Sequence, residues 1–164
     1  MLLPVEITPS ADEKAGSNLR LGATLKWLVC REICIPGHAD LELALPVARD
    51  PSASPPIASL FAKARAHLPR PAPGSWKIHA TLDEHRFELT VLTGKPEERG
   101  GFFPLEPNQI DNAAAPKAIP LDRGLKIEMP KSDQLLKAPP RLKGVLVLAG
   151  ERGYVIEAAV TTGK

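Results

Sequence analysis

Proline is the feature that most limits what this chain can fold into. The sequence has 18 prolines and 12 glycines in 164 residues. Each proline lacks the backbone N–H, and its ring clashes with the preceding helical turn, so long helices are repeatedly interrupted. Hydrophobic residues still make up 43% of the chain, which is enough for a packed core. The sequence therefore predicts short strands joined by turns, in one domain or in one domain with a fragment of another.

Two segments alternate between apolar and other residues with a period of two. In the first, 18–27, the odd-numbered residues are Leu, Leu, Ala, Leu and Trp. In the second, 41–45, leucines alternate with Glu42 and Ala44. This period is typical of strands that bury one face. We predict that the two strands form a hairpin with the cysteines at its tip, and that a further short strand covers residues 2–8.

The remainder of the chain has the pattern of a second β domain. Residues 50–56 have the Pro, Ser and Ala composition of a linker, and apolar residues at helical spacing predict a helix over 57–68. Strands are predicted at 76–82, 86–92, 101–105, 124–129, 142–148 and 154–160. Short strands at regular spacing with a lone helix are typical of a sandwich. We predict an all-β fold: an immunoglobulin-like β-sandwich with one short helix, preceded by a cysteine-bearing β-hairpin segment.

Charge and hydropathy exclude several classes of function. The net charge is +2, from 21 basic and 19 acidic residues that are interspersed, and only 4% of residues are aromatic. A nucleic-acid surface needs clustered cations or stacking aromatics, so no nucleic-acid partner is predicted. No apolar run approaches the roughly 18 residues that cross a bilayer. The sequence therefore predicts no membrane-spanning segment within these residues.

The cysteines carry the most specific signal. The chain has only two, Cys30 and Cys34, separated by three residues directly after a predicted strand. A turn between them brings their Cα atoms within the roughly 4.4–6.8 Å that a disulfide needs. Closing so small a ring stabilises the fold by only about 2 kcal/mol, whereas a strained, exposed bridge exchanges readily. The spacing therefore favours a redox-active pair, with Cys30 and Cys34 as the catalytic residues and no bound cofactor or metal.

Two other interpretations remain open. Cys30, Cys34 and His38 are each four residues apart, and thiolates with an imidazole are suitable ligands for Cu(I) or zinc. Alternatively, the chain is a non-catalytic interaction domain with a structural disulfide. Arg31 would stabilise a thiolate and Glu32 would oppose it, so the sequence does not indicate which sulfur attacks.

The cysteine segment resembles a known family. Residues 27–37 read Trp-Leu-Val-Cys-Arg-Glu-Ile-Cys-Ile-Pro-Gly, preceded by Leu-Leu-Pro-Val-Glu-Ile-Thr-Pro and followed by Leu-Glu-Leu-Ala-Leu-Pro-Val. This stretch is similar to the N-terminal periplasmic region of the thiol:disulfide interchange protein DsbD family, in particular to its longer ScsB-like subgroup. Gly-Phe-Phe-Pro at 101–104 and Leu-Lys-Gly-Val-Leu-Val-Leu at 142–148 extend the resemblance.

The resemblance implies a function and a compartment. It implies that Cys30 and Cys34 receive electrons from a thioredoxin-like domain of the same full-length protein, which a transmembrane domain supplies. It further implies that they reduce periplasmic disulfide-bearing partners, as the protein-disulfide reductase domain of an inner-membrane protein. Residues 1–49 would then be the C-terminal part of the cysteine-bearing domain, and residues 50–164 a second sandwich. We expect the exposed face of the first segment to pack on the second domain or on another copy of the chain.

Overall fold

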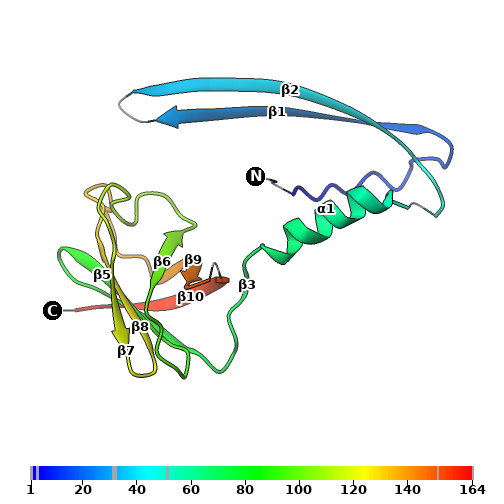
Figure 1. The fold of residues 1–164 in the computed structure, drawn as a ribbon. Helices are drawn as coiled ribbons and strands as arrows, with labels where there is room; N and C mark the ends of the chain where they lie inside the picture. The colour runs from blue at the N-terminus through cyan, green and yellow to red at the C-terminus, as the bar shows by residue number, and fades with distance from the viewer. Residues whose placement is uncertain (1, 3, 31–32, 51, 151, 164) are drawn as a thin grey trace. The chain divides into compact units, whose positions relative to one another are not determined.

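The computed structural model describes residues 2, 4–30, 33–50, 52–150 and 152–163, and the side chain of Cys30 is also outside what it describes. Figure 1 shows the elements in chain order, from a long hairpin through one helix to a compact group of strands. The chain divides into two compact units, 1–62 and 63–164. The predicted division at residues 49–50 lies before the helix, whereas this one lies within it.

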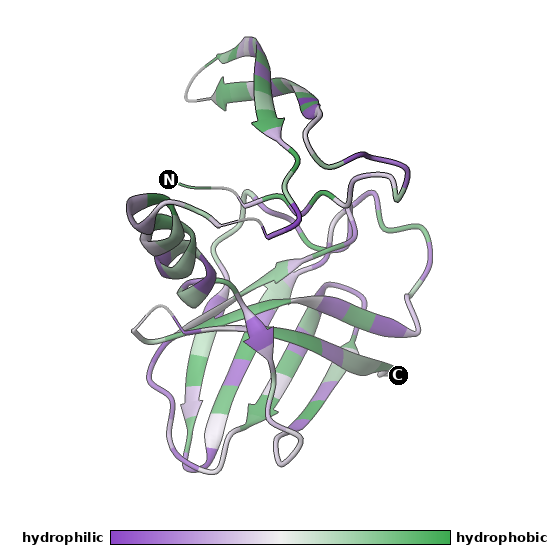
Figure 2. Ribbon diagram, turned by 90° about the vertical axis from the view of Figure 1, so that its right-hand side faces the viewer, coloured by the Kyte–Doolittle hydropathy of each residue, from purple (hydrophilic) through white to green (hydrophobic). Residues whose placement is uncertain are grey.

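The first unit contains a single hairpin. Strand β1 (Asn18–Cys30) pairs with strand β2 (Cys34–Pro46) in antiparallel register along their whole length. Beyond the strands, the Val47 N–H donates to the Ser17 carbonyl at 2.9 Å and continues the pairing. The bands of hydrophobic and hydrophilic residues along both strands are visible in Figure 2. None of the described residues of this unit is buried, so the hairpin has no core of its own.

The strand predicted over residues 2–8 is wrong, because the described residues of this segment form no strand. Pro4 and Pro9 cannot donate to a ladder, and no neighbouring strand pairs with the segment among the recorded pairings. A short apolar run in the sequence does not by itself distinguish a strand from an irregular segment, and the described residues of this run have no recorded strand pairing.

Helix α1 (Pro55–Ala66) confirms the predicted helix, displaced by two residues toward the N-terminus. Two prolines occupy its first turn, where a missing N–H costs nothing. The Ala58 N–H donates to the Ser54 carbonyl at 2.9 Å at the start of the helix. No residue of the helix is buried.

The second unit is a two-layer β-sandwich. One layer joins β6 (Gly100–Pro104), β9 (Arg141–Leu148) and the first part of β10 (Arg152–Thr162), with the short β3 (Arg70–Pro71) beside β10. The other layer joins the end of β10 to β4 (Lys77–Leu82), β5 (Arg86–Leu92), β8 (Gly124–Pro130) and β7 (Lys117–Leu121). β10 therefore belongs to both layers and connects them. The predicted all-β, immunoglobulin-like fold with one short helix is confirmed.

The core of the sandwich comes from alternate residues of its strands. In β5, Phe87, Leu89 and Val91 are fully buried, while the residues between them are partly exposed. β8, β9 and β10 repeat this pattern, with Leu125, Ile127, Met129, Leu142, Leu146, Leu148, Tyr154, Ile156 and Ala158. Full burial of a Val, Leu, Ile, Phe or Met side chain stabilises the fold by about 1.5–3 kcal/mol relative to exposure. All the buried hydrophobic residues that the structure describes lie in this unit.

The turn between β4 and β5 makes one acid-dependent contribution to stability. The backbone N–H groups of His85 and Arg86 donate to Asp83 Oδ1 at 2.7 and 2.8 Å, and they hold the pKa of this carboxyl below its ordinary value of 3.8. Because the folded pKa is the lower one, the contribution is present above pH 3.8 and is lost as the pH falls below it. Acid unfolding of an Asp83→Asn chain should therefore be less steep below pH 3.8, and an NMR titration should place the Asp83 midpoint below 3.8. Equal steepness in both chains would contradict this.

Candidate functional site: the cysteine pair at the hairpin tip

The register of the hairpin brings the two cysteines together. Cys30 is the last residue of β1 and Cys34 the first of β2, and they form the final pair of the ladder. Residues that face each other in an antiparallel ladder have Cα atoms about 4.5–5.5 Å apart, within the range of roughly 4.4–6.8 Å that a disulfide requires. The backbone is thus compatible with a bridge across the tip.

Cys34 is solvent-exposed and is in the disulfide-bonded state. No described cysteine is a free thiol. The side chain of Cys30 and the loop residues Arg31 and Glu32 lie outside the described residues, so the predicted influence of these two charges on the sulfurs is not addressed by the structure. Exposure of Cys34 gives another protein access to this sulfur.

The hairpin has two chemically different faces, because side chains alternate along each strand and paired residues share a face. We define the apolar face as the odd-numbered residues of 19–29 and 35–45, all of them hydrophobic or glycine. The polar face comprises the even-numbered residues of 18–30 and 34–46. Cys34 belongs to the polar face, opposite to the leucine-rich surface, and it is the ladder partner of Cys30.

Two residue pairs separate the cysteines from the rest of the polar face. Next to them lie Leu28 and Pro36, which face each other, and then Lys26 and His38. An open depression of about 640 Å³ is lined by these four residues with Trp27 and Gly37. The surface next to the cysteines on this face is therefore apolar at Leu28 and Pro36, and the basic residues Lys26 and His38 lie beyond it.

Cross-strand polar contacts fix the pairing further from the tip. The Thr24 hydroxyl donates to Asp40 Oδ1 at 2.7 Å, and Arg20 Nη2 lies 3.4 Å from Glu42 Oε2. Thr24 and Asp40 face each other in the ladder, whereas Arg20 faces Ala44 and reaches Glu42 diagonally, since Glu42 faces Gly22. Exposed pairs of this kind contribute little energy, about 0–1 kcal/mol each. These contacts oppose a one-residue shift in the register of β1 against β2, which would move the cysteines to different faces.

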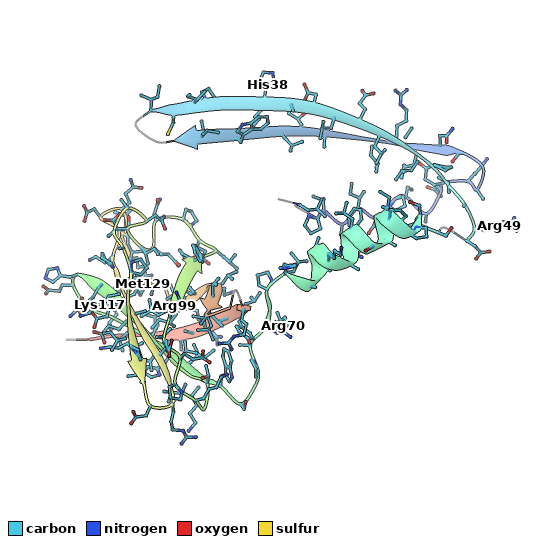
Figure 3. The ribbon with its side chains drawn as sticks, in the orientation of Figure 1. His38, Arg49, Arg70, Arg99, Lys117 and Met129 are labelled. Atoms are coloured by element: carbon cyan, nitrogen blue, oxygen red, sulfur yellow. The ribbon has the colours of Figure 1, made fainter. Side chains whose placement is uncertain are left out.

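In the metal-site alternative, His38 lies too far from Cys34 to be the third ligand. His38 lies well along β2 from the turn, as Figure 3 shows, opposite Lys26 and four residues from Cys34. A strand rises about 3.3 Å per residue, so the two Cα atoms are roughly 13 Å apart. One ion bound at about 2.0–2.3 Å from each ligand cannot span that distance. Among the described residues, no group of three or more His, Cys, Asp or Glu side chains is placed to hold a metal ion.

The predicted environment of the pair needs correction. Trp27 was expected to fill a core, but its side chain is 46% exposed. Val29 and Ile35, the pair next to the cysteines in the ladder, lie on the apolar face, and Leu28 and Pro36 are the next pair on the polar face. The sequence already contained the signal for this arrangement: both cysteines have even numbers, whereas all the hydrophobic residues of the two strands except Leu28 and Ala44 have odd ones.

The remaining candidates behave as ordinary surface residues. His67, His79 and His85 are exposed. Asp83 accepts backbone hydrogen bonds in the turn between β4 and β5. In the described part of the chain, no helix is long and apolar enough to cross a membrane. The cysteine pair remains the candidate site.

Comparison with protein-family models, with curated proteins and with solved structures finds no match to this chain.

Proposed function

We propose that the chain is a thiol–disulfide exchange module in which Cys30 and Cys34 are the redox pair. The observation that carries the proposal is the end of the ladder, where the two cysteines face each other across a connection of three residues. Cys34 is exposed and bonded rather than free. A disulfide at an exposed tip is accessible to an attacking thiolate, which is the first requirement for exchange.

The position on the hairpin also supports exchange rather than reinforcement. The pair lies at the end of a ladder in which thirteen residues of each strand are already paired. A bridge there closes a short ring and adds roughly 2 kcal/mol at most. Opening it leaves every other ladder pair in place. The pair can therefore pass between its joined and separate forms while the hairpin persists.

The reaction transfers two electrons without a cofactor. In the reduced module, one thiolate attacks a sulfur of the partner's disulfide, so that a mixed disulfide forms and the partner's other sulfur leaves as a thiolate and takes up a proton. The second cysteine, as its thiolate, then attacks the mixed disulfide and releases the partner's remaining sulfur. The module ends with a Cys30–Cys34 disulfide, and the partner ends as a dithiol. A dithiol donor regenerates the module by the same steps in the opposite direction.

The resemblance to the DsbD family supplies the proposed partners. The donor would be a thioredoxin-like domain of the same full-length protein, and the acceptors would be periplasmic disulfide-bearing proteins. An oxidising compartment is where protein disulfides persist and need such reduction. The module would then work in the periplasm as part of an inner-membrane protein.

A redox titration tests the proposal. The oxidised chain is equilibrated in glutathione buffers of graded potential, quenched by acid and alkylated, and the modified thiols are counted by mass spectrometry. We expect reversible interconversion at a potential more oxidising than about −300 mV, since structural disulfides typically lie below that value. Circular dichroism of the same samples should stay unchanged. A bridge that opens only when the fold is lost would overturn the proposed function.

A further inference from the structure

We infer that the apolar face of the hairpin is the contact surface of a homodimer, in which the hairpins of two chains stack face to face. The inference does not depend on the chemistry of the cysteines, which lie on the opposite face. It begins from an imbalance in the first unit, where a complete hydrophobic face has no covering layer. Seven large side chains of this face are between 39% and 61% exposed, with Leu25 the least exposed and Val29 the most.

The area of this face is too large for a surface left in water. Half-exposed side chains in this number present on the order of 700 Å² of apolar area, whereas the largest patch on a typical monomer is about 300–600 Å². Two such faces in contact bury roughly 1,400 Å², within the range of about 1,200–2,000 Å² for stable, specific interfaces. One hairpin against another therefore provides the area that a dimer requires.

The shape of the face suits stacking of one sheet on another. The position of Gly37 opposite Trp27 leaves room for the indole, since a Cβ on residue 37 would overlap the Trp27 ring. The largest side chain of the face thus lies across the sheet instead of projecting from it. A face of leucine, isoleucine and valine side chains can approach an identical face at about 10 Å, the usual spacing of packed sheets.

The chemistry of the face favours a second copy over a different partner. It carries no charged side chain, and the indole N–H of Trp27 is its one side-chain hydrogen-bond donor, so it offers few of the polar contacts by which a dissimilar partner is selected. A two-fold axis makes such a face complementary to itself, because each leucine meets an apolar residue of the partner. Pairing through the strand edges would satisfy backbone groups but would leave this face uncovered. Face-to-face stacking covers it, and leaves each cysteine pair on the outside of the dimer.

Sedimentation of the full chain tests the inference. We expect a concentration-dependent monomer–dimer equilibrium with a dissociation constant in the micromolar range or below, as interfaces of this area show. Leu25→Lys should raise that constant at least about 100-fold, because the two-fold axis places the buried charge in the interface twice. Thr24→Lys, the matched control, puts the same side chain on the polar face at the next residue and should leave the constant within about threefold of its original value.

A second measurement does not rely on any variant. In a mixture of isotope-labelled and unlabelled chains, methyl groups of Leu25, Leu41 and Leu43 should show nuclear Overhauser effects between chains. A chain that remains monomeric at about 1 mM would overturn the inference. So would leucine methyl contacts that occur only within one chain, or a dimer that Leu25→Lys leaves equally tight.

Discussion

A Cys34→Ser chain should release no reduced product from a disulfide substrate. In a single-turnover assay, the pre-reduced chain is mixed without oxygen with a peptide that contains one disulfide. The native chain should yield one dithiol peptide per chain and end with its own cysteines joined. In the variant the ladder still ends opposite residue 34, but no second sulfur is present to resolve a mixed disulfide. The yield should fall to the uncatalysed background, as measured by chromatography of the alkylated peptide.

The controls separate exchange from a purely structural disulfide. Thr24→Ser keeps a hydroxyl opposite Asp40 on the same face of β1 and should retain the full yield. The chain with serine at both positions 30 and 34 should give no product and no mixed disulfide. If both serine chains instead retained the biological activity of the native chain, Cys30 and Cys34 would form only a structural bridge in an interaction domain, and the proposed function would fail.

The strands were predictable because their period is local. In β5 the alternation of Phe87, Leu89 and Val91 with polar residues predicted both the bounds of the strand and its buried face. The prolines were harder to interpret. β7 went unpredicted because Pro120 lies within it, although the strand is at the edge of its sheet, where a missing N–H is tolerated.

Burial could not be predicted from the period alone. The alternation in 18–27 is as regular as that in β5, yet none of the described residues of β1 is buried, whereas Phe87, Leu89 and Val91 of β5 are fully buried. Period fixes which side chains share a face, but a covering layer decides whether that face is buried. The same distinction applies to the predicted strand 101–105: Phe102 is 3% exposed and Phe103 is 62% exposed, because neighbours in a strand point to opposite faces.

The cysteine site was partly predictable from its spacing. Three intervening residues suggested a turn that closes a bridge, and the ladder places Cys30 opposite Cys34. The spacing left open whether His38 is a third ligand, because a spacing of four brings residues together on a helix and separates them along a strand. The register, set by thirteen pairs across two strands, was needed to decide between these cases.

Contacts between residues far apart in the sequence leave no pattern in the sequence itself. One of them, between Glu97 and Arg152, lies in the second unit. Glu97 lies outside every predicted strand and helix, yet its side chain is 3% exposed. Arg152 Nη2 donates to Glu97 Oε2 at 2.7 Å, across 55 residues of sequence. This hydrogen bond is the main reason that the pKa of Arg152 is raised above its ordinary value. The pair therefore holds a carboxylate that is almost withdrawn from water.

Removing the cation should destabilise the second unit more than removing the carboxylate. In Arg152→Met the apolar stem is kept, but Glu97 is left buried with only the Thr93 hydroxyl, 3.3 Å away, as a donor among its recorded hydrogen bonds. We expect the free energy of unfolding to fall by about 3–5 kcal/mol, the usual cost of an unpaired buried charge. Glu97→Ala should cost less, since the Arg152 side chain is 31% exposed and can be hydrated.

Urea unfolding measures both effects. Fluorescence of Trp76, whose ring centroid lies 4.7 Å from that of Tyr154, reports on this unit in chains that also carry Trp27→Phe. Glu98→Ala, beside Glu97 but exposed, is the matched control and should change the free energy by less than about 0.5 kcal/mol. An Arg152→Met chain as stable as this control would show that Glu97 finds other partners when Arg152 is lost. Equal losses for Arg152→Met and Glu97→Ala would show that the hydrogen bond itself, rather than the stranded carboxylate, determines the cost.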